Sequence, residues 1–209
     1  MSATSLRLVA SAPTAALRRA VFGGDDEVDE GGLRAALAAS SALRRAGATS
    51  VSSPARAALQ TARAAGLAPV VDPALADCAY GRWEGRPLSA VLADEPDAVQ
   101  AWLADPAAAP HGGESFIDVV SRITTWLDAC AGEPGHQVAV THPVVIRAAL
   151  VSVLHVPPAA FRRIDVAPLS VTRLRARGGL WTLHLPTTTS GWTTPQGNVT
   201  THMKQAAAD

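Results

Sequence analysis

Short apolar runs alternate along this chain with longer stretches whose apolar residues recur at helical spacing. The apolar runs at 6–10, 48–52, 68–71 and 137–141 have the length of buried β-strands. The stretches that predict helices are 30–46, 54–65, 96–104, 115–131 and 144–154. Two further runs, 170–175 and 180–185, flank Gly178-Gly179 and predict a β-hairpin. This alternation indicates an α/β fold with a largely parallel sheet covered by helices.

The composition changes near residue 187, where Thr, Ser, Gly and Gln become dominant. A chain of 209 residues is long enough for one sizeable core. We therefore predict one domain over residues 1–186, followed by a loosely attached tail over residues 187–209.

Charge and composition narrow the classes of partner. Lysines and arginines number 18, as do the acids, so no bulk field draws the chain to nucleic acid or to an anionic membrane. Residues 1–5 lack the basic and apolar regions of a signal peptide, and no apolar run is long enough to span a membrane. We expect a cytoplasmic protein with no nucleic-acid or membrane partner.

The cysteines and histidines predict no metal site and no cofactor. Cys78 and Cys130 are far apart in the sequence and form no Cys-x-x-Cys pair. The six histidines include no His-x-x-x-His or His-Glu-x-x-His motif. Two free, buried thiols in a reducing compartment are the simplest interpretation.

Several segments of the chain carry short motifs whose order and spacing can be compared with known families. They are Leu6–Thr14, Asp25–Ala36, Ser52–Ala62 (Ser-Ser-Pro-Ala-Arg-Ala-Ala-Leu-Gln-Thr-Ala), Leu75–Gly85 (ending Gly-Arg-Trp-Glu-Gly), His111–Ser115 (His-Gly-Gly-Glu-Ser) and Val138–Arg147 (with Thr-His-Pro). In order and spacing they resemble the histidine phosphatase (phosphoglycerate mutase-like) superfamily over roughly residues 6–185. The resemblance implies a three-layer α/β/α sandwich with a mainly parallel sheet and a pocket at the carboxyl ends of the strands.

The resemblance also implies a reaction, and this chain lacks several residues that the reaction uses. In the family, the first strand ends in Arg-His-Gly, and that His takes up the phosphoryl group. Here Ala10 and Ser11 occupy the Arg and His positions. The phosphate-binding Arg of the Ser-Ser-Pro helix falls on Ala57, and Arg56 lies one position early, about 100° around the helix. The family's proton donor corresponds to Asp77.

Other positions match. The family's second active-site His is present as His142, and Thr14 is retained. We therefore predict Ser11, Asp77 and His142 as candidate catalytic residues. Thr14, Arg56, Glu114 and His111 are the candidate substrate-binding residues. Glu114 also has a purely structural interpretation, because an acid at a helix start is stabilised by the helix dipole.

Three functional hypotheses follow from these losses. Each missing charged hydrogen bond removes about 1.5–3 kcal/mol of phosphate binding, and Ser is a poor nucleophile without a neighbouring base. The first hypothesis is a catalytically degenerate protein whose pocket takes a small neutral or cationic ligand, or none. The second is a repurposed hydrolase or acid–base enzyme that uses Ser11, His142 and an acid, Asp77 or Glu114.

The third hypothesis is a residual phosphomonoesterase or mutase, in which another arginine enters the pocket. Arg56, Arg82 and Arg147 are the arginines that this hypothesis considers. The sequence leaves the oligomeric state open, with a homodimer as one alternative.

Overall fold

The computed structural model describes residues 3–185, so the predicted tail lies outside the described residues. Within this part, a six-stranded sheet has the strand order β3-β2-β4-β1-β5-β6. The strands are β1 (Ala3–Ala10), β2 (Thr49–Ser52), β3 (Val70–Val71), β4 (Gly135–Thr141), β5 (Val171–Arg177) and β6 (Leu180–His184). Each predicted strand is present with small shifts at its ends.

The sheet is mixed rather than purely parallel. β1 pairs in parallel with β4, β4 with β2, and β2 with β3. β5 runs antiparallel to β1, and β6 antiparallel to β5. The Gly178-Gly179 turn joins these two strands as a hairpin, which confirms that prediction. The hairpin therefore adds an antiparallel edge to a four-stranded parallel sheet.

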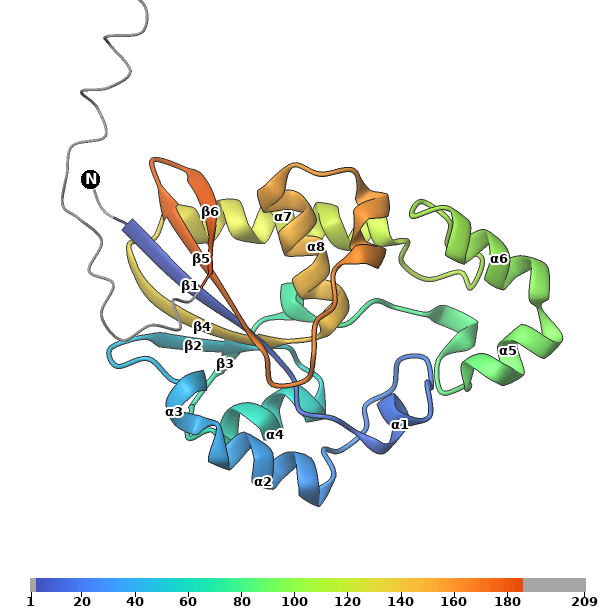
Figure 1. Ribbon diagram of the computed structural model, residues 1–209, viewed down its shortest axis with the longest axis horizontal. Coiled ribbons are helices and arrows are strands. Elements are labelled where there is room, and N and C mark those ends of the chain that lie inside the picture. The colour runs from blue at the N-terminus through green and yellow to red at the C-terminus, as the bar shows by residue number, and fades with distance from the viewer. Residues whose placement is uncertain (1–2, 186–209) are drawn as a thin grey trace, which may run out of the picture.

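Helices cover both faces of the sheet. The α-helices of residues 3–185 are α1 (Ala15–Arg18), α2 (Glu30–Ala38), α3 (Ser40–Leu43), α4 (Arg56–Ala64), α5 (Leu88–Asp94), α6 (Pro96–Ala104), α7 (Phe116–Ala131) and α8 (Pro143–Leu154). Figure 1 shows α7 and α8 on one face and α2, α3 and α4 on the other. This arrangement confirms the predicted three-layer α/β/α sandwich.

The central strand β1 is buried on both faces because its apolar residues alternate between two cores. Leu6, Leu8 and Ala10 pack in the cluster that includes α7 and α8. Val9 points the other way, into the cluster that contains Ala58 of α4. A strand buried on both sides is continuously apolar at its end, which is the pattern Leu8-Val9-Ala10. The carboxyl end of β1 is thus fixed in the middle of the molecule.

The helical predictions differ from the structure mainly at short elements. The predicted helix 30–46 is interrupted after Ala38, and α3 follows as a separate short helix. The sequence analysis missed α1, α5 and the short 3₁₀ helices Pro73–Leu75, Gly81–Trp83 and Pro158–Arg163. Helices of one or two turns carry too few residues for a periodic pattern, so tertiary contacts decide them.

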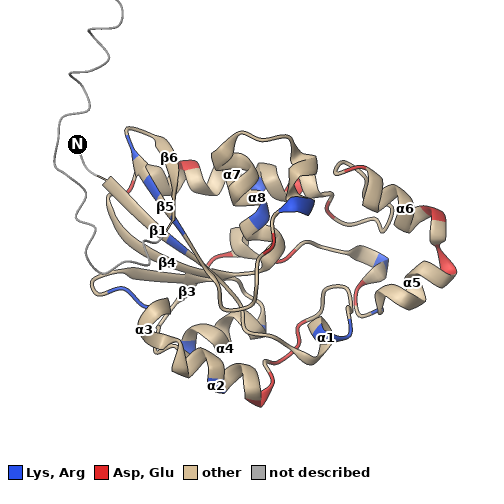
Figure 2. Cartoon of the chain, viewed as in Figure 1, with Lys and Arg blue, Asp and Glu red and all other residues tan. Residues whose placement is uncertain are grey.

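α5 and α6 form a lobe beside the carboxyl ends of the strands (Figure 1). An aromatic cluster attaches it to the body: Phe22 packs on Trp83 and Trp102 with ring centroids 5.2 and 5.4 Å apart. Figure 2 shows acidic residues at the connection between α5 and α6, whereas basic residues lie along β1 and β5. None of the helices within residues 3–185 has both the length and the apolar character needed to cross a membrane.

The loops that carry the predicted motifs cross each other at Gly113. The Glu114 N–H donates to the Ala79 carbonyl at 2.8 Å, and the Arg82 N–H donates to the His111 carbonyl at 3.0 Å. A Cβ atom built on Gly113 would overlap the Ala79 carbonyl oxygen. Gly113 is therefore explained by the close approach of two backbones, and Gly112 by its positive φ of 78°.

We expect Gly113→Ala to lower the free energy of unfolding by about 1–3 kcal/mol, because one of the two backbones must move to admit a methyl group. Gly132→Ala is the matched control. A Cβ at Gly132 makes only an ordinary contact with the Ala129 carbonyl. Urea unfolding of both variants measures the difference, and equal stability of the two would contradict this explanation of Gly113.

Candidate active site

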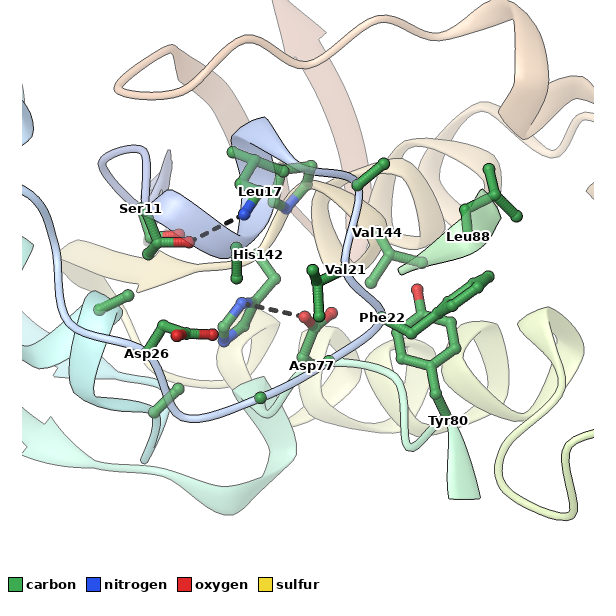
Figure 3. Close-up of a pocket in the computed structure, with 18 of the residues that line it drawn as sticks. Ser11, Leu17, Val21, Phe22, Asp26, Asp77, Tyr80, Leu88, His142 and Val144 are labelled. Atoms are coloured by element: carbon green, nitrogen blue, oxygen red, sulfur yellow. Dashed lines mark hydrogen bonds and ion pairs between the residues drawn. The ribbon is translucent and has the colours of Figure 1, made fainter. Parts of the chain in front are cut away.

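A cavity of about 430 Å³ lies where β1, β2 and β4 end, at the predicted edge of the sheet. Ser11 follows β1, and His142 follows β4. Ala57, in the first turn of α4, also lines the cavity. The other described lining residues are Ala12, Thr14, Ala16, Leu17, Ala20, Val21, Phe22, Gly23, Gly24, Asp26, Ala55, Asp77, Tyr80, Leu88, Trp102, Pro143, Val144 and Arg147. Figure 3 shows the labelled members of this set.

His142 is held by a partner at each ring nitrogen. It is the N-cap residue of α8, and Pro143 begins the helix. Its Nε2 lies 2.8 Å from the Ser53 hydroxyl oxygen, and its Nδ1 lies 3.4 Å from an Asp77 carboxylate oxygen (Figure 3 draws the Asp77 contact). A carboxylate accepts hydrogen bonds, so Asp77 favours the tautomer with its proton on Nδ1. Nε2 is then free to accept the Ser53 hydroxyl proton.

Ser53 is the site residue that sequence reasoning missed. It is fully buried, and its hydroxyl also accepts the N–H of Ala55 at 3.2 Å. The order Ser53–His142–Asp77 resembles the arrangement of a Ser-His-Asp triad. However, Ser53 does not line the cavity, so its hydroxyl orients His142 and does not face a ligand. The Ser-Ser-Pro motif gave the signal, but nothing in the sequence pairs its second serine with a distant histidine.

Ser11 and Thr14 both line the cavity. The Ser11 backbone N–H donates to the Thr141 carbonyl at 2.8 Å, which ties the turn after β1 to the end of β4. The Thr14 hydroxyl accepts the Leu17 N–H at 3.1 Å and caps α1. The described contacts therefore pair His142 with Ser53 rather than with Ser11.

Alanine occupies the two positions at which the sequence resemblance expects phosphate-binding arginines. Ala57 lines the cavity as a methyl group, and Ala10 is buried in the core. Arg56 lies outside the lining. Its side chain pairs with Glu27, and its N–H donates to Asp25 at 2.6 Å. The one-position offset seen in the sequence has thus carried this arginine to the surface.

The other two arginines that the residual-phosphatase hypothesis considered are also engaged. Arg82 pairs with Glu95, outside the lining. Among the described residues of the lining, Arg147 is the only arginine or lysine. Its Nε donates to the Ile164 carbonyl at 2.8 Å.

Glu114 holds the segment that carries Asp77 and lies outside the cavity lining. Its carboxylate accepts two N–H groups of Arg122, at 3.0 and 2.9 Å, and the Ala79 N–H at 3.1 Å. Arg122 also donates to the carbonyls of Ala74 and Ala76, at 2.6 and 3.1 Å. This clamp fixes the loop on both sides of Asp77. Its geometry supports the structural interpretation of Glu114.

His111 also lies outside the lining and is 1% exposed. Its Nδ1 accepts the Gly113 N–H at 3.0 Å, and its ring packs against Tyr80 and Trp83. Its Nε2 has no hydrogen-bond partner among the described residues. Burial, and secondarily the charge of Arg82, lowers the pKa of His111. His111 is therefore a neutral ring that packs in the core behind the cavity wall, and its role is structural.

Cys78, next to Asp77, is free and buried. Burial, and then the charges of Asp77 and Glu114, raises the pKa of its thiol to about 12. Cys130 is also free, and burial raises its pKa to about 12. A neutral thiol is a weak nucleophile, so the cysteines add no chemistry to the site. Within residues 3–185, no group of three or more His, Cys, Asp and Glu side chains is placed to hold a metal ion.

We expect Arg122→Met to lower the free energy of unfolding by about 1.5–3 kcal/mol, because it leaves the half-buried Glu114 carboxylate and two loop carbonyls without their donor. Arg34→Met is the control, since Arg34 makes only an exposed i,i+4 contact with Glu30 at 3.7 Å. Urea unfolding measures both. Equal effects would mean that the clamp does not stabilise the Asp77 loop.

We expect stability to fall as the pH is lowered from 7 to 5, with His111 contributing to the loss. An unfolded His titrates at about pH 6.5, and burial lowers the pKa of His111 in the folded chain. Between these pKa values the unfolded chain binds more protons, so acid favours unfolding. His111→Phe should flatten this slope in urea titrations at several pH values. An unchanged slope in His111→Phe would contradict this role of His111.

Comparisons with known proteins identify the family to which this fold and this pocket belong. The profile of the histidine phosphatase superfamily (branch 1) matches residues 12–189. The bifunctional protein Rv2228c of Mycobacterium tuberculosis is 34% identical over 165 residues, which is 74% of this chain and 45% of that protein. Glucosyl-3-phosphoglycerate phosphatase of the same species is 40% identical over 103 residues, 47% of this chain and 46% of that protein. The chain thus spans less than half the length of these curated relatives.

The solved structures give the same picture. The structure of mycobacterial glucosyl-3-phosphoglycerate phosphatase Rv2419c has a TM-score of 0.75 and 28% identity, and the match covers 87% of this chain and 97% of that chain. Its complex with VO3 has a TM-score of 0.77 and 29% identity, with coverage of 87% and 97%. With the matched profile covering most of the chain, this protein belongs to the histidine phosphatase superfamily.

Proposed function

We propose that this protein is a catalytically degenerate member of its superfamily, with a retained pocket that binds a small ligand and little or no phosphatase activity. The observation that carries the proposal is the lining of the cavity beside His142. Ser11 and Ala57 line it where the family's nucleophilic His and a phosphate-binding Arg belong. The wall that a phosphoryl group would touch therefore lacks both the nucleophilic His and this phosphate-binding Arg.

The electrostatics of the lining support the same conclusion. Phosphoryl transfer depends on positioning the phosphate and on neutralising its oxygens. Asp26 and Asp77 line this cavity together with Arg147. A phosphate dianion would meet two carboxylates and one guanidinium, and each lost charged hydrogen bond costs about 1.5–3 kcal/mol. The cavity is therefore poorly suited to bind a phosphate monoester.

The relatives point to the opposite hypothesis, residual phosphomonoesterase activity. Some of them are named glucosyl-3-phosphoglycerate phosphatase or probable phosphoglycerate mutase. The matched region of this chain begins at residue 12, immediately after the two replaced positions Ala10 and Ser11. The lining of the cavity argues against this hypothesis, because the reaction needs a nucleophilic His and phosphate-binding Arg residues at these positions.

A second candidate function is acid–base or hydrolytic catalysis on a less anionic substrate. The array Ser53–His142–Asp77 favours it, because a His oriented by a carboxylate can move a proton. Ser11 would then be the hydroxyl that faces the substrate. The cytoplasmic location stays a prediction, and the oligomeric state stays open.

We expect the purified protein to hydrolyse neither p-nitrophenyl phosphate nor p-nitrophenyl acetate above the rate of its His142→Ala variant. The physical reason is that the cavity lacks a nucleophile activated by a base. Stopped assays with the wild type, Ser11→Ala and His142→Ala measure this. Phosphate hydrolysis lost in His142→Ala would overturn the proposal. Ester hydrolysis lost in both variants would establish the second candidate function instead.

A further inference from the structure

The wall of the cavity opposite Ser11 is aromatic. Phe22, Tyr80 and Trp102 all line the cavity. Phe22 lies 5.2 Å from Tyr80 and 5.4 Å from Trp102 between ring centroids, so the three rings form one continuous surface. Figure 3 shows Phe22 and Tyr80 together at one end of the cavity, next to Leu88 and Val144. Such a surface binds apolar groups, and its π faces attract organic cations.

The other end of the cavity is acidic. Figure 3 shows the carboxylates of Asp26 and Asp77 on opposite sides of the His142 ring. One Asp77 oxygen accepts the Cys78 N–H at 2.9 Å, and the other lies 3.4 Å from His142 Nδ1. That second distance is longer than an ordinary hydrogen bond, so the oxygen can still accept a closer donor.

Asp26 reaches the cavity because its neighbours are engaged elsewhere. Asp25 accepts the N–H of Arg56, and Glu27 pairs with the Arg56 side chain. Arg56 thus holds Asp25 and Glu27 at the surface. Asp26, which lies between them in the sequence, lines the cavity. With Arg147 as its single cation among the described lining residues, the cavity carries a net negative charge when His142 is neutral.

We propose that the ligand of this cavity is an organic cation, an amine with an apolar or aromatic body. Its ammonium group lies at the acidic end of the cavity, where Asp26 and Asp77 flank His142, and its body lies on the Phe22–Tyr80–Trp102 wall. This inference rests on the proposed function, because it needs a pocket that no longer holds phosphate. The volume of about 430 Å³ falls in the range of small-molecule sites. Removing the positive groups of the family site while keeping its acids has reversed the charge that the cavity selects.

The acids and the aromatic wall have separate tasks in this site. The carboxylates select a positive charge, since a charge-assisted hydrogen bond is about twice as strong as a neutral one. The rings supply apolar contact area that a neutral analogue of the same shape would use equally. The difference in affinity between an amine and the matching alcohol therefore isolates the contribution of the acids.

Titration calorimetry with 2-phenylethylamine, 2-phenylethanol and phenyl phosphate tests the proposal. We expect the wild type to bind the amine at least about tenfold more tightly than the alcohol, the difference made by one charged hydrogen bond. Phenyl phosphate should bind most weakly. Asp26→Asn, which keeps the side-chain shape, should reduce the amine affinity to near that of the alcohol and leave the alcohol unaffected.

Two further variants make the result specific. Glu30→Gln removes an exposed negative charge in α2, outside the lining, so the amine affinity should stay within about twofold of the wild type, since exposed charges are screened. Trp102→Leu should weaken the amine and the alcohol alike. Thermal unfolding checks that each variant is folded.

The outcomes separate this inference from the proposed function. Equal binding of amine and alcohol would overturn the inference, as would no binding of the amine at millimolar concentration. Neither result would contradict the proposed function, which is a pocket without phosphatase activity. An equal loss in Asp26→Asn and Glu30→Gln would also overturn the inference. Tightest binding of phenyl phosphate, with its hydrolysis, would overturn both the inference and the proposed function.

Discussion

The parallel pairing of β1 with β4 in the centre of the sheet is the constraint on which the site depends. In this register Ala10 lies opposite Thr141, so the residues that follow, Ser11 and His142, leave the sheet at the same edge. The Ser11 N–H bonds to the Thr141 carbonyl and continues the ladder by one step. Because β1 is buried on both faces, neither end point can move without disturbing a core. The family's catalytic positions are therefore still built, whatever residues occupy them.

The rest of the structure supports this edge from outside. The Glu114–Arg122 clamp fixes the loop that presents Asp77 to His142, and Ser53 holds the other nitrogen of that ring. The aromatic cluster around Phe22 attaches the lobe of α5 and α6 and supplies the far wall of the cavity. Several of the motifs that resemble the family thus have structural roles that do not require catalysis. These structural roles support the proposal that the pocket is retained without phosphatase activity.

Sequence reasoning predicted the sheet, the long helices and the pocket edge, because apolar periodicity over many residues is decided locally. It also brought Ser11, Thr14, Asp77 and His142 to one cavity. It grouped Arg56, Glu114 and His111 with the ligand, whereas the structure places them outside the lining.

The reason is that a motif gives the order of residues but not the direction of a side chain. The Arg56 side chain pairs with Glu27 on a separate loop, and the Glu114 side chain pairs with Arg122 in the helix that follows it, α7. The Ser53–His142 contact joins residues 89 positions apart and has no local signal. The acidic and aromatic character of the cavity likewise depends on Asp26, Phe22 and Trp102. These come from two segments that meet only when the lobe of α5 and α6 packs on the body.

The affinity of the cavity for a phosphate mimic tests the central claim most directly. Orthovanadate is titrated into the wild type and into Ala57→Arg. The variant places an arginine at the position where the family resemblance expects a phosphate-binding Arg. If the pocket is degenerate, the wild type does not bind orthovanadate at micromolar concentration, and the variant gains affinity by about tenfold or more, as expected for a restored charged hydrogen bond. Micromolar binding by the wild type, unchanged in the variant, would contradict it.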